Sequence, residues 1–343
     1  MRVLHDVPLA PRTTLGVGGS ACRFVRVETV GEVREALALA AGDPVLVLGG
    51  GSNLVVRDHG WDGLVVEIAI PGMAVRVEAD VARVSVSAGV VWDDFVAEMV
   101  GAGFAGIECL SGIPGLVGAT PMQNVGAYGQ EVANTIEFVR AIDRTTGDLD
   151  ELEPNECKFA YRSSVFKSSE RWIVVEVGFR FVRSAASPPI RYPELARALG
   201  VADEASAPAA EVRRVVLELR RAKGMVVDPA DPDSRSAGSF FTNPIVDAAA
   251  LRALEARLGP GVAFPRFAAP GGRTKLAAAW LIERAGFAKG HTVGRVGISS
   301  KHALALVNRG GATARELLDL ARDIQDAVRA QLGIELVPEP VVV

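Results

Sequence analysis

The chain has 343 residues, of which 49% are hydrophobic and 23% charged, a composition that supports folded domains and excludes a disordered chain. Its formal net charge of −4 and its 6% aromatic content argue against a nucleic-acid-binding surface. Phosphate binding needs a basic face, and base stacking needs aromatic side chains. We therefore expect no nucleic-acid partner.

The cysteines, the histidines and the N-terminal segment limit the chemistry and the compartment. Cys22, Cys109 and Cys157 are far apart and form no CxxC pair, and the four histidines are scattered, so we expect reduced thiols and no metal site. The first residues lack the apolar core of a signal peptide, and no apolar run reaches the length of about 20 residues that spans a bilayer. We expect a cytoplasmic protein without membrane insertion.

The first half of the chain predicts many short strands with two helices. A capping box, Thr29 to Glu32, begins a helix that should end near Gly42, and apolar residues at helical spacing predict a second helix over 92–100. Apolar or alternating runs predict strands at 45–48, 54–56, 64–68, 82–88, 139–143 and 172–181.

After a Ser- and Pro-rich stretch at 184–189, the second half predicts a smaller α+β unit. Helices are expected around 212–219, over 276–285, and from a second capping box, Thr313 to Glu316, as far as Val328. Strands are expected to begin at Ser239 and to run over 302–307 and 334–343.

Two glycine-rich segments carry the first functional hypothesis. Residues 49–53 (GGGSN) lie between two predicted strands, where glycine backbone can cradle a phosphate or simply form a hairpin bend. A Rossmann motif is disfavoured because a strand and not a helix follows. Residues 106–132 hold several glycines and the amide pair Gln123 and Asn124, which suits a loop around a flat polar cofactor, or an Ω-like loop without function.

Six motifs in order make the chain resemble the UDP-N-acetylenolpyruvoylglucosamine reductase (MurB) family of peptidoglycan precursor synthesis. They are LGGGSNLVV (48–56), SGIPGLVGATPMQNVGAYGQE (111–131), YRSS (161–164), AGSFFTNP (237–244), AAWLIERAGFAKG (278–290) and LVPEP (336–340). The resemblance implies an α+β fold with a vanillyl-alcohol-oxidase (PCMH-type) FAD-binding domain of two subdomains and a smaller α+β substrate-binding domain. It also implies bound FAD, NADPH as electron donor and a UDP-sugar substrate.

The resemblance also implies domain limits and cofactor contacts. The FAD-binding domain would span 1–184, a connecting segment 185–222, and the substrate-binding domain 223–343, whose C-terminal tail would return to the active site. We expect a monomer. The cofactor-binding residues carried over from the motifs are Gly49, Gly50, Gly51, Ser52, Asn53, Leu54, Ser111, Gly112, Ile113, Pro114, Gly115, Gly118, Ala119, Gln123, Asn124, Gly126, Ala127, Tyr128 and Gly129.

Three catalytic residues follow from the same comparison. Reduction of an enolpyruvyl double bond leaves negative charge on the α-carbon and its carboxylate, which a guanidinium fork such as that of Arg162 can bind. Ser239 would donate the proton to the α-carbon, and no GxSxG elbow surrounds it. Glu339 would hydrogen-bond the enolate if protonated, or orient Arg162 if ionised; Pro340 after it departs from the family pattern.

Substrate contacts are expected from Tyr192, Lys223 and Asn243. Tyr192 in RYPEL (191–195) matches the tyrosine-loop type of the family. Arg220 and Arg221 either extend a basic substrate site or complement the dipole of a helix C-terminus. Arg284 stands where relatives often carry glutamine. The absence of a second nucleotide fingerprint fits ping-pong use of one cleft by NADPH and then the substrate.

Two competing functions remain open at this point. The first is an oxidase of the same flavoprotein superfamily, which would have no enolate to protonate and hence no need of the Arg162, Ser239 and Glu339 combination. The second is a nucleotide-binding scaffold without catalysis, which would yield a colourless protein.

Overall fold

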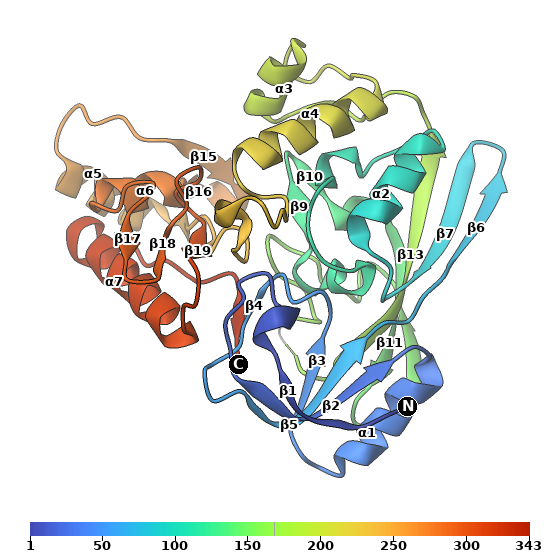
Figure 1. The fold of residues 1–343 in the computed structure, drawn as a ribbon. Coiled ribbons are helices and arrows are strands. Elements are labelled where there is room, and N and C mark those ends of the chain that lie inside the picture. The colour runs from blue at the N-terminus through green and yellow to red at the C-terminus, as the bar shows by residue number, and fades with distance from the viewer. Residues whose placement is uncertain (168) are drawn as a thin grey trace. The chain divides into compact units, whose positions relative to one another are not determined.

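The computed structural model describes residues 1–167 and 169–343 (Figure 1). The described chain forms two compact units. Unit 1 consists of Met1–Val7, Ala21–Gly51 and Trp61–Ala222, and unit 2 of Pro8–Ser20, Ser52–Gly60 and Lys223–Val343. Unit 2 therefore includes two short segments from the first sixty residues, so the GGGSN segment begins in unit 1 and ends in unit 2.

The N-terminal part of unit 1 is a four-stranded sheet in the order β1 (Leu4–Pro8), β2 (Ser20–Val27), β5 (Trp61–Ile68) and β3 (Val45–Leu48). β2 and β3 both pair parallel to β5. Helix α1 (Val30–Ala40) lies against this sheet, with Val33 and Ala36 fully buried (Figure 1). The predicted helix is confirmed, and Ala41 ends it in a left-handed conformation, φ 52°.

Thr29 caps the start of α1, as predicted. Its hydroxyl accepts a hydrogen bond from the Glu32 N–H at 3.1 Å. The Glu32 carboxylate accepts from the N–H of Glu28 at 2.7 Å and lies 3.4 Å from the N-terminal ammonium group. The backbone N–H groups of Glu28 and Thr29 and the ammonium group together lower the pKa of Glu32.

The larger sheet of unit 1 is antiparallel. Its order is β12 (Leu149–Leu152), β11 (Ile136–Asp143), β13 (Trp172–Arg183), β7 (Val81–Ser87) and β6 (Met73–Glu78), with β8 (Phe104–Ala105) also on β13. Helix α2 (Trp92–Gly101) lies on one face, where Phe95 contacts Phe179 and Phe181 at 5.0 and 6.0 Å between ring centroids (Figure 1). Large aromatic burial makes this the main core of unit 1.

The rest of unit 1 consists of short elements and a helix pair. The glycine-rich segment contains short 3-10 helices at Glu108–Leu110, Val117–Ala119 and Pro121–Gln123, followed by the two-stranded pair β9 (Gly126–Ala127) and β10 (Gln130–Glu131). Helices α3 (Pro193–Leu199) and α4 (Ala209–Ala222) share a small core with Cys109. The glycine-rich segment is thus ordered by packing and not by regular secondary structure.

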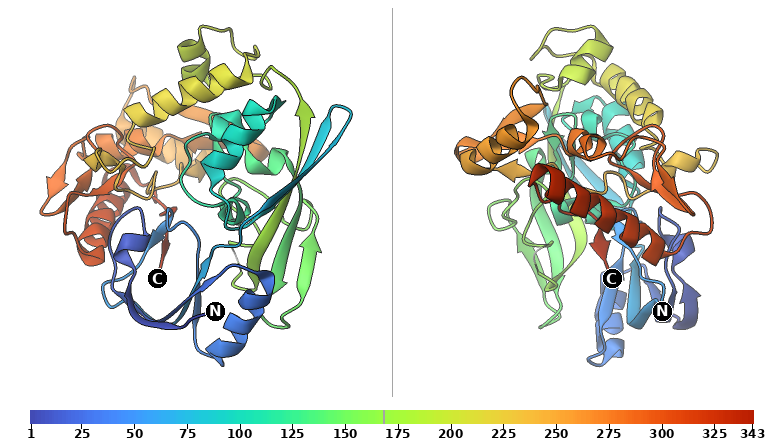
Figure 2. Two further views of the ribbon diagram at one scale, coloured as in Figure 1. Left: turned by 45° about the vertical axis from the view of Figure 1, so that its right-hand side comes forward. Right: turned by 90° about the vertical axis from the view of Figure 1, so that its left-hand side faces the viewer.

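Unit 2 has its own core around the long helix α7 (Ala314–Leu332), the red helix of Figure 2. Two small antiparallel sheets accompany it, β14 (Ile245–Val246), β16 (Arg273–Leu276), β15 (Arg266–Ala269), and β17 (Thr292–Val293), β18 (Val296–Ile298), β19 (Leu306–Asn308). Helices α5 (Ala248–Leu258) and α6 (Ala278–Arg284) contact α7. β4 (Leu54–Val55) pairs parallel with β20 (Val341–Val342). The second capping box, Thr313 to Glu316, is fully formed.

Three predicted strands of unit 2 are wrong or shorter than expected. No strand begins at Ser239, because Phe240 and Phe241 bond to different neighbours, Leu304 and Pro338. The run at 302–307 begins as a turn in which the Ser299 hydroxyl accepts the N–H of His302, and the strand starts at Leu306. In the tail, Pro338 and Pro340 have no N–H to donate, so only Val341–Val342 forms a strand.

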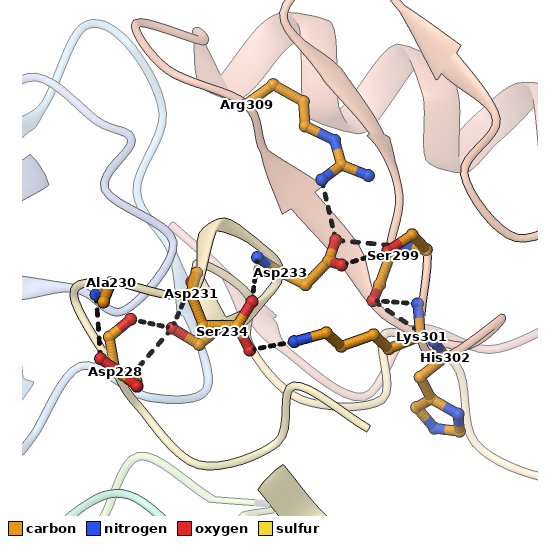
Figure 3. A network of polar contacts seen from close by, with 10 residues as sticks. Asp228, Ala230, Asp231, Asp233, Ser234, Ser299, Lys301, His302 and Arg309 are labelled. Atoms are coloured by element: carbon orange, nitrogen blue, oxygen red, sulfur yellow. Dashed lines mark hydrogen bonds and ion pairs between the residues drawn. The ribbon is translucent and has the colours of Figure 1, made fainter. Parts of the chain in front are cut away.

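A network of carboxylates orders the segment that precedes Ser239 (Figure 3). Asp233, 3% exposed, accepts hydrogen bonds from the N–H and hydroxyl of Ser300 and from the guanidinium of Arg309, the last at 2.8 Å. Asp231 accepts from the Asp233 N–H at 3.1 Å and from the Lys301 ammonium at 2.8 Å. The buried carboxylate of Asp233 and the half-buried one of Asp231 thereby hold the loop of residues 228–236 against the turn before β19.

We expect Asp233→Asn to destabilise the protein in a pH-dependent way. Burial alone would raise the pKa of Asp233, but the hydrogen bonds from Ser300 and Arg309 lower it below its ordinary value. A lowered folded-state pKa means that the ionised group stabilises the fold above the unfolded-state pKa, about 3.9, and that this contribution is lost as the pH falls through the folded-state value.

The expected loss at pH 7 is about 2 kcal/mol, measured by thermal unfolding of wild type and variant at pH 7 and in steps from pH 5 to pH 3. The difference between the two proteins should shrink below about pH 4. Asp148→Asn, at an exposed position, is the control and should change little. A difference that stays constant down to pH 3 would contradict the role of the ionised carboxylate.

Candidate active site

The two glycine-rich segments pack against each other in unit 1 so closely that backbone lies against backbone. A Cβ atom added to Gly50 would lie 2.8 Å from the Cα atom of Gly115, closer than real Cβ contacts. One added to Gly118 would lie 2.4 Å from the Cβ atom of Ala88. Gly115 also has φ 121°, a conformation that other residues rarely adopt. The absence of side chains at these positions is therefore a requirement of the packing.

Helices α2 and α4 fix the start of the second segment through one carboxylate. Asp93 accepts the N–H of Gly112 at 2.6 Å and both terminal nitrogens of Arg213, at 2.6 and 3.0 Å. Burial opposes ionisation of Asp93, but the bonds from Arg213 and Gly112 outweigh it and lower its pKa. No pattern in the sequence connects Asp93 with Arg213, 120 residues away, so sequence reasoning missed both residues.

The buried side chains of Ser111 and Glu108 make hydrogen bonds within the protein. The Ser111 hydroxyl donates to the carbonyl of Glu108 at 2.6 Å, and Ser111 is fully buried. The carboxylate of Glu108, also fully buried, accepts the N–H of Gly106 at 2.6 Å and the amide of Gln130 at 2.7 Å. The predicted contribution of Ser111 to a cofactor site therefore depends on its backbone.

The amide pair links the glycine-rich segment to the YRSS motif. Asn124, 1% exposed, donates to Glu131 at 2.7 Å and to the carbonyl of Ala160 at 3.3 Å, and accepts the N–H of Ala133 at 3.1 Å. The Gln123 side chain accepts from the Lys167 ammonium at 3.0 Å. The predicted contacts of these amides to a cofactor stay a prediction, since the hydrogen bonds described above join parts of unit 1 to each other.

Arg162 lies at the tip of a two-residue hairpin, closed by hydrogen bonds in both directions between Ala160 and Ser163. Its φ of 52° is left-handed, which costs a residue with a side chain about 1–2 kcal/mol. The guanidinium Nη2 donates to the carbonyl of Gly126 at 2.7 Å. A Cβ atom on Gly126 would approach Nη1 to 3.2 Å. The glycine thus leaves room for the guanidinium, and the carbonyl fixes its direction.

A second cluster of unit 1 combines two tyrosines with an arginine. The rings of Tyr128 and Tyr192 meet edge to face, 5.2 Å between centroids. Burial raises the pKa of Tyr128 to about 12, against the opposing charge of Arg220, and also raises the pKa of Tyr192. Burial lowers the pKa of Arg220 to about 10. At neutral pH the cluster therefore offers two neutral phenols and one cation.

The sequence left two alternatives for Arg220 and Arg221, a basic substrate site or cations at a helix C-terminus, and the structure distinguishes the two residues. Its side chain is half-buried and its charge interacts with Tyr128 and Asp93, whereas Arg221 is exposed. Arg220 is part of the cluster with the tyrosines, and exposed Arg221 fits the alternative of a cation at the end of α4.

In unit 2, the segment of Ser239 and the C-terminal tail lie side by side. The N–H of Glu339 donates to the carbonyl of Phe240 at 2.9 Å, and the N–H of Thr242 donates to Val337 at 3.0 Å. Ser239 is half-buried, one residue before Phe240. The structure therefore brings together Ser239 and Glu339, which are 100 residues apart in sequence.

The other predicted residues of unit 2 have defined places. The side-chain oxygen of Asn243 accepts the N–H of Ala278, the first residue of α6, at 2.9 Å. Any ligand contact of Asn243 would therefore use its amide N–H donors. Lys223 is half-buried at the first position of the main segment of unit 2. Ser52, Asn53 and Leu54 are half-buried and lead into β4.

The remaining predicted positions form the connections of the second segment. Gly129 is the turn between β9 and β10, with φ 85°. Ile113 and Ala127 pack against the aromatic core of unit 1. The others are half-buried within the segment, namely Pro114 and Ala119.

Three further features of the described residues concern metals, thiols and membranes. No group of three or more His, Cys, Asp or Glu side chains among them is arranged to hold a metal ion. Cys22 is exposed, Cys109 and Cys157 are buried, and all three are free thiols. Of the helices in residues 1–167 and 169–343, none is long and apolar enough to cross a membrane.

Two family models match most of the chain. One, described as an FAD binding domain, covers residues 22–152. The other, described as the UDP-N-acetylenolpyruvoylglucosamine reductase C-terminal domain, covers residues 229–343. A protein of that name from Thermobifida fusca is 53% identical and aligns with 99% of this chain and 97% of its own. One from Saccharopolyspora erythraea is 51% identical, with 98% and 94% aligned.

The chain belongs to the UDP-N-acetylenolpyruvoylglucosamine reductase (MurB) family. The crystal structure of MurB from Thermus caldophilus matches 100% of the chain and 99% of its own, with 29% identity and a TM-score of 0.67. The 6-hydroxy-D-nicotine oxidase from Arthrobacter nicotinovorans, 15% identical with a TM-score of 0.52, covers 97% of the chain and 86% of its own and shows the fold alone. The predicted family and fold class are confirmed.

Family membership gives the activity in general terms. The chain is an FAD-dependent UDP-N-acetylmuramate dehydrogenase of peptidoglycan precursor synthesis that uses NADPH. The glycine-rich segments fit a flavin dinucleotide, because backbone without side chains can approach a diphosphate closely. At Gly50 the second segment is so close that a Cβ atom would lie 2.8 Å from the Cα atom of Gly115, so both segments present bare backbone there.

We expect Gly50→Ala to weaken flavin binding. The added methyl group would have to push the backbone at Gly115 away, and backbone moves less readily than a side chain. The measurement is flavin absorbance per protein after purification and dialysis, with circular dichroism as the test of folding.

Gly49→Ala is the matched control, since its Cβ atom would lie 3.8 Å from Ala119, an ordinary contact. It should lose less flavin than Gly50→Ala. Equal flavin content in both variants, whether full or reduced, would show that the contact of the two glycine segments does not decide binding.

Proposed function

We propose that Arg162, Ser239 and Glu339 perform the proton and charge chemistry of the reduction of UDP-N-acetylglucosamine enolpyruvate to UDP-N-acetylmuramate. FAD, when bound and reduced by NADPH, supplies the hydride that the enolpyruvyl β-carbon accepts. The single observation that best supports the proposal is the left-handed backbone of Arg162 together with the anchoring of its guanidinium on Gly126.

Arg162 is proposed to bind the carboxylate of the substrate as negative charge develops on it. Addition of hydride to the β-carbon leaves charge on the α-carbon that spreads into the adjacent carboxylate. A donor fixed before the reaction stabilises this charge without reorganising. The carbonyl of Gly126 holds Nη2 at 2.7 Å, so the planar group keeps one orientation. Arg162 is one of several non-glycine residues with positive φ, and such a conformation persists only where the surrounding structure requires it, as the hairpin and the Gly126 carbonyl do here.

Ser239 is proposed to protonate the α-carbon. A serine hydroxyl is a weak acid, but an enolate carbon is a strong base, so placement matters more than acidity. Support comes from the immobile surroundings of Ser239, since Phe240 and Phe241 are each 1% exposed and Phe240 is bonded to Leu304 on one side and Glu339 on the other. Glu339, adjacent to this segment, is proposed to stabilise the enolate together with Arg162.

Arg162 belongs to unit 1, and Ser239 and Glu339 belong to unit 2. The proposed reaction needs all three groups at one substrate molecule. Arg162→Lys changes a residue of unit 1 and Ser239→Ala a residue of unit 2, so the part that each unit plays in the reaction is tested by itself.

Tyr192, Lys223 and Asn243 are proposed to bind the UDP-sugar. Tyr192 is 40% exposed, an unusual position for a large aromatic ring, and its raised pKa keeps the hydroxyl a hydrogen-bond donor at neutral pH. The amide donors of Asn243 and the ammonium of Lys223 are suited to diphosphate oxygens. On this basis we propose the tyrosine-loop type of the family for this chain; that it acts as a monomer stays a prediction.

We expect Ser239→Ala to block protonation selectively. Reduction of the bound flavin by NADPH should keep its rate, because Ser239 takes no part in it. Reoxidation by the enolpyruvyl substrate should slow by about 10²–10⁴-fold, the range of general-acid contributions. Stopped-flow absorbance of the flavin measures both half-reactions on one preparation. If substrate reoxidises the variant as fast as wild type, Ser239 is not the proton donor.

We expect Arg162→Lys to lose roughly 10²-fold in kcat/KM for the enolpyruvyl substrate, because an ammonium group cannot reproduce the planar fork. Flavin content should stay at the wild-type level. Arg171→Lys is the control, since Arg171 is an exposed arginine of the same part of the chain, paired with Asp143. Equal turnover of wild type and Arg162→Lys would remove the argument from bidentate binding.

A further inference from the structure

Asn53 bonds to the C-terminal tail on both sides of Pro340. Its side-chain amide donates to the carbonyl of Glu339 at 3.3 Å. Its own carbonyl accepts the N–H of Val341 at 3.0 Å. Pro340 between them has a restricted φ and no N–H group. Asn53 therefore binds the residues on both sides of Pro340, Glu339 and Val341.

The tail is joined to the same segment as far as its last residue. Val341 and Val342 pair parallel with Leu54 and Val55. The N–H of Val343 donates to Val55 at 3.0 Å, and its carbonyl oxygen accepts the N–H of Arg57 at 2.8 Å. Chain ends are poorly ordered unless they are tied down, and this one is tied down at every residue after Pro340.

Glu339 is held from the opposite side by the segment of Ser239. Its N–H donates to Phe240 at 2.9 Å, while its carbonyl accepts from Asn53. The backbone of Glu339 is thus fixed between Phe240 and Asn53, and the direction of its carboxyl group depends on both. Phe240 contributes through its backbone, which any residue supplies, whereas the contact from Asn53 comes from its side chain.

We infer that Asn53 is a positioning residue for Glu339, an inference that rests on the proposed role of Glu339 in stabilising the enolate. The side chain of Asn53 sets the orientation of residue 339, and the β4–β20 pairing keeps the tail in register with it. This assigns the Asn53 side chain a task different from the cofactor contact that the sequence suggests for it. The task concerns the second half-reaction, in which the substrate reacts.

The test is a double-mutant cycle on the complete holoenzyme with Asn53→Ala, Glu339→Gln and the double variant. Stopped-flow absorbance gives the rate of substrate-driven flavin reoxidation, and flavin content and the flavin spectrum are recorded for each protein. We expect Asn53→Ala to slow reoxidation about tenfold with flavin content and spectrum unchanged. In the Glu339→Gln background the same change should have no further effect. Asn155→Ala, an exposed asparagine, is the matched control.

Each outcome bears on a different statement. Slowing by Asn53→Ala that multiplies fully with that of Glu339→Gln would overturn the inference, because Asn53 would then act independently of Glu339. Loss of flavin or a shifted flavin spectrum in Asn53→Ala would also overturn it, in favour of a cofactor contact. Wild-type reoxidation in Glu339→Gln would instead refute the proposed role of Glu339.

A second variant keeps the test decisive if Asn53→Ala folds poorly. Asn53→Asp has the same shape but, when ionised, cannot donate to the carbonyl of Glu339. Reoxidation by this variant should be slow at pH 8 and recover relative to wild type towards pH 4, where an added carboxyl group with its ordinary pKa of about 3.9 is close to half protonated and can donate again. A pH-independent ratio of the two rates would count against the hydrogen bond.

Discussion

Direct contact of backbone with backbone is the constraint on which the cofactor-binding part of this protein depends. A Cβ atom added to Gly50 would lie 2.8 Å from the Cα atom of Gly115, and one added to Gly118 would lie 2.4 Å from the Cβ atom of Ala88, so neither position accepts a side chain. Close packing of this kind immobilises loops that have no regular secondary structure and few of the hydrogen bonds found between the strands of a sheet. The same constraint recurs at Gly126, where the missing side chain makes room for the guanidinium of Arg162. The glycines thus shape the two glycine-rich segments and the position of the proposed electrophile together.

Polar side chains with little exposure fix the conformation of these loops through hydrogen bonds, which glycines cannot provide because they have no side chain. Asp93 binds Gly112 and Arg213, Glu108 binds Gly106 and Gln130, and Asn124 binds Ala160 and Glu131. Each of these side chains joins a loop to a second element, and each would be costly to bury without its partners. Their partners are distributed along the chain, so the loops around the site are ordered only when the whole of unit 1 is folded.

The sequence predicted the periodic elements well and the irregular ones poorly. Helices α1, α2 and α7 have apolar residues at helical spacing, which burial on one face requires. The segment at Ser239–Phe241 also looks like a strand, yet its two phenylalanines are buried by different neighbours and no ladder forms. The motifs located Arg162, Ser239 and Glu339, but the left-handed conformation of Arg162 and the Asp93–Arg213 pair depend on contacts between distant residues. Periodicity carries no information about such contacts.

The charges around the tyrosine pair limit where pH dependence can arise. Arg220, with its pKa lowered to about 10 by burial, remains a cation throughout the neutral range, and Tyr128, with its pKa raised to about 12, remains a neutral phenol. Tyr192 is shifted in the same direction as Tyr128. The charge of this cluster is therefore constant between about pH 6 and pH 9. Any change of rate in that interval must therefore come from a group outside this cluster.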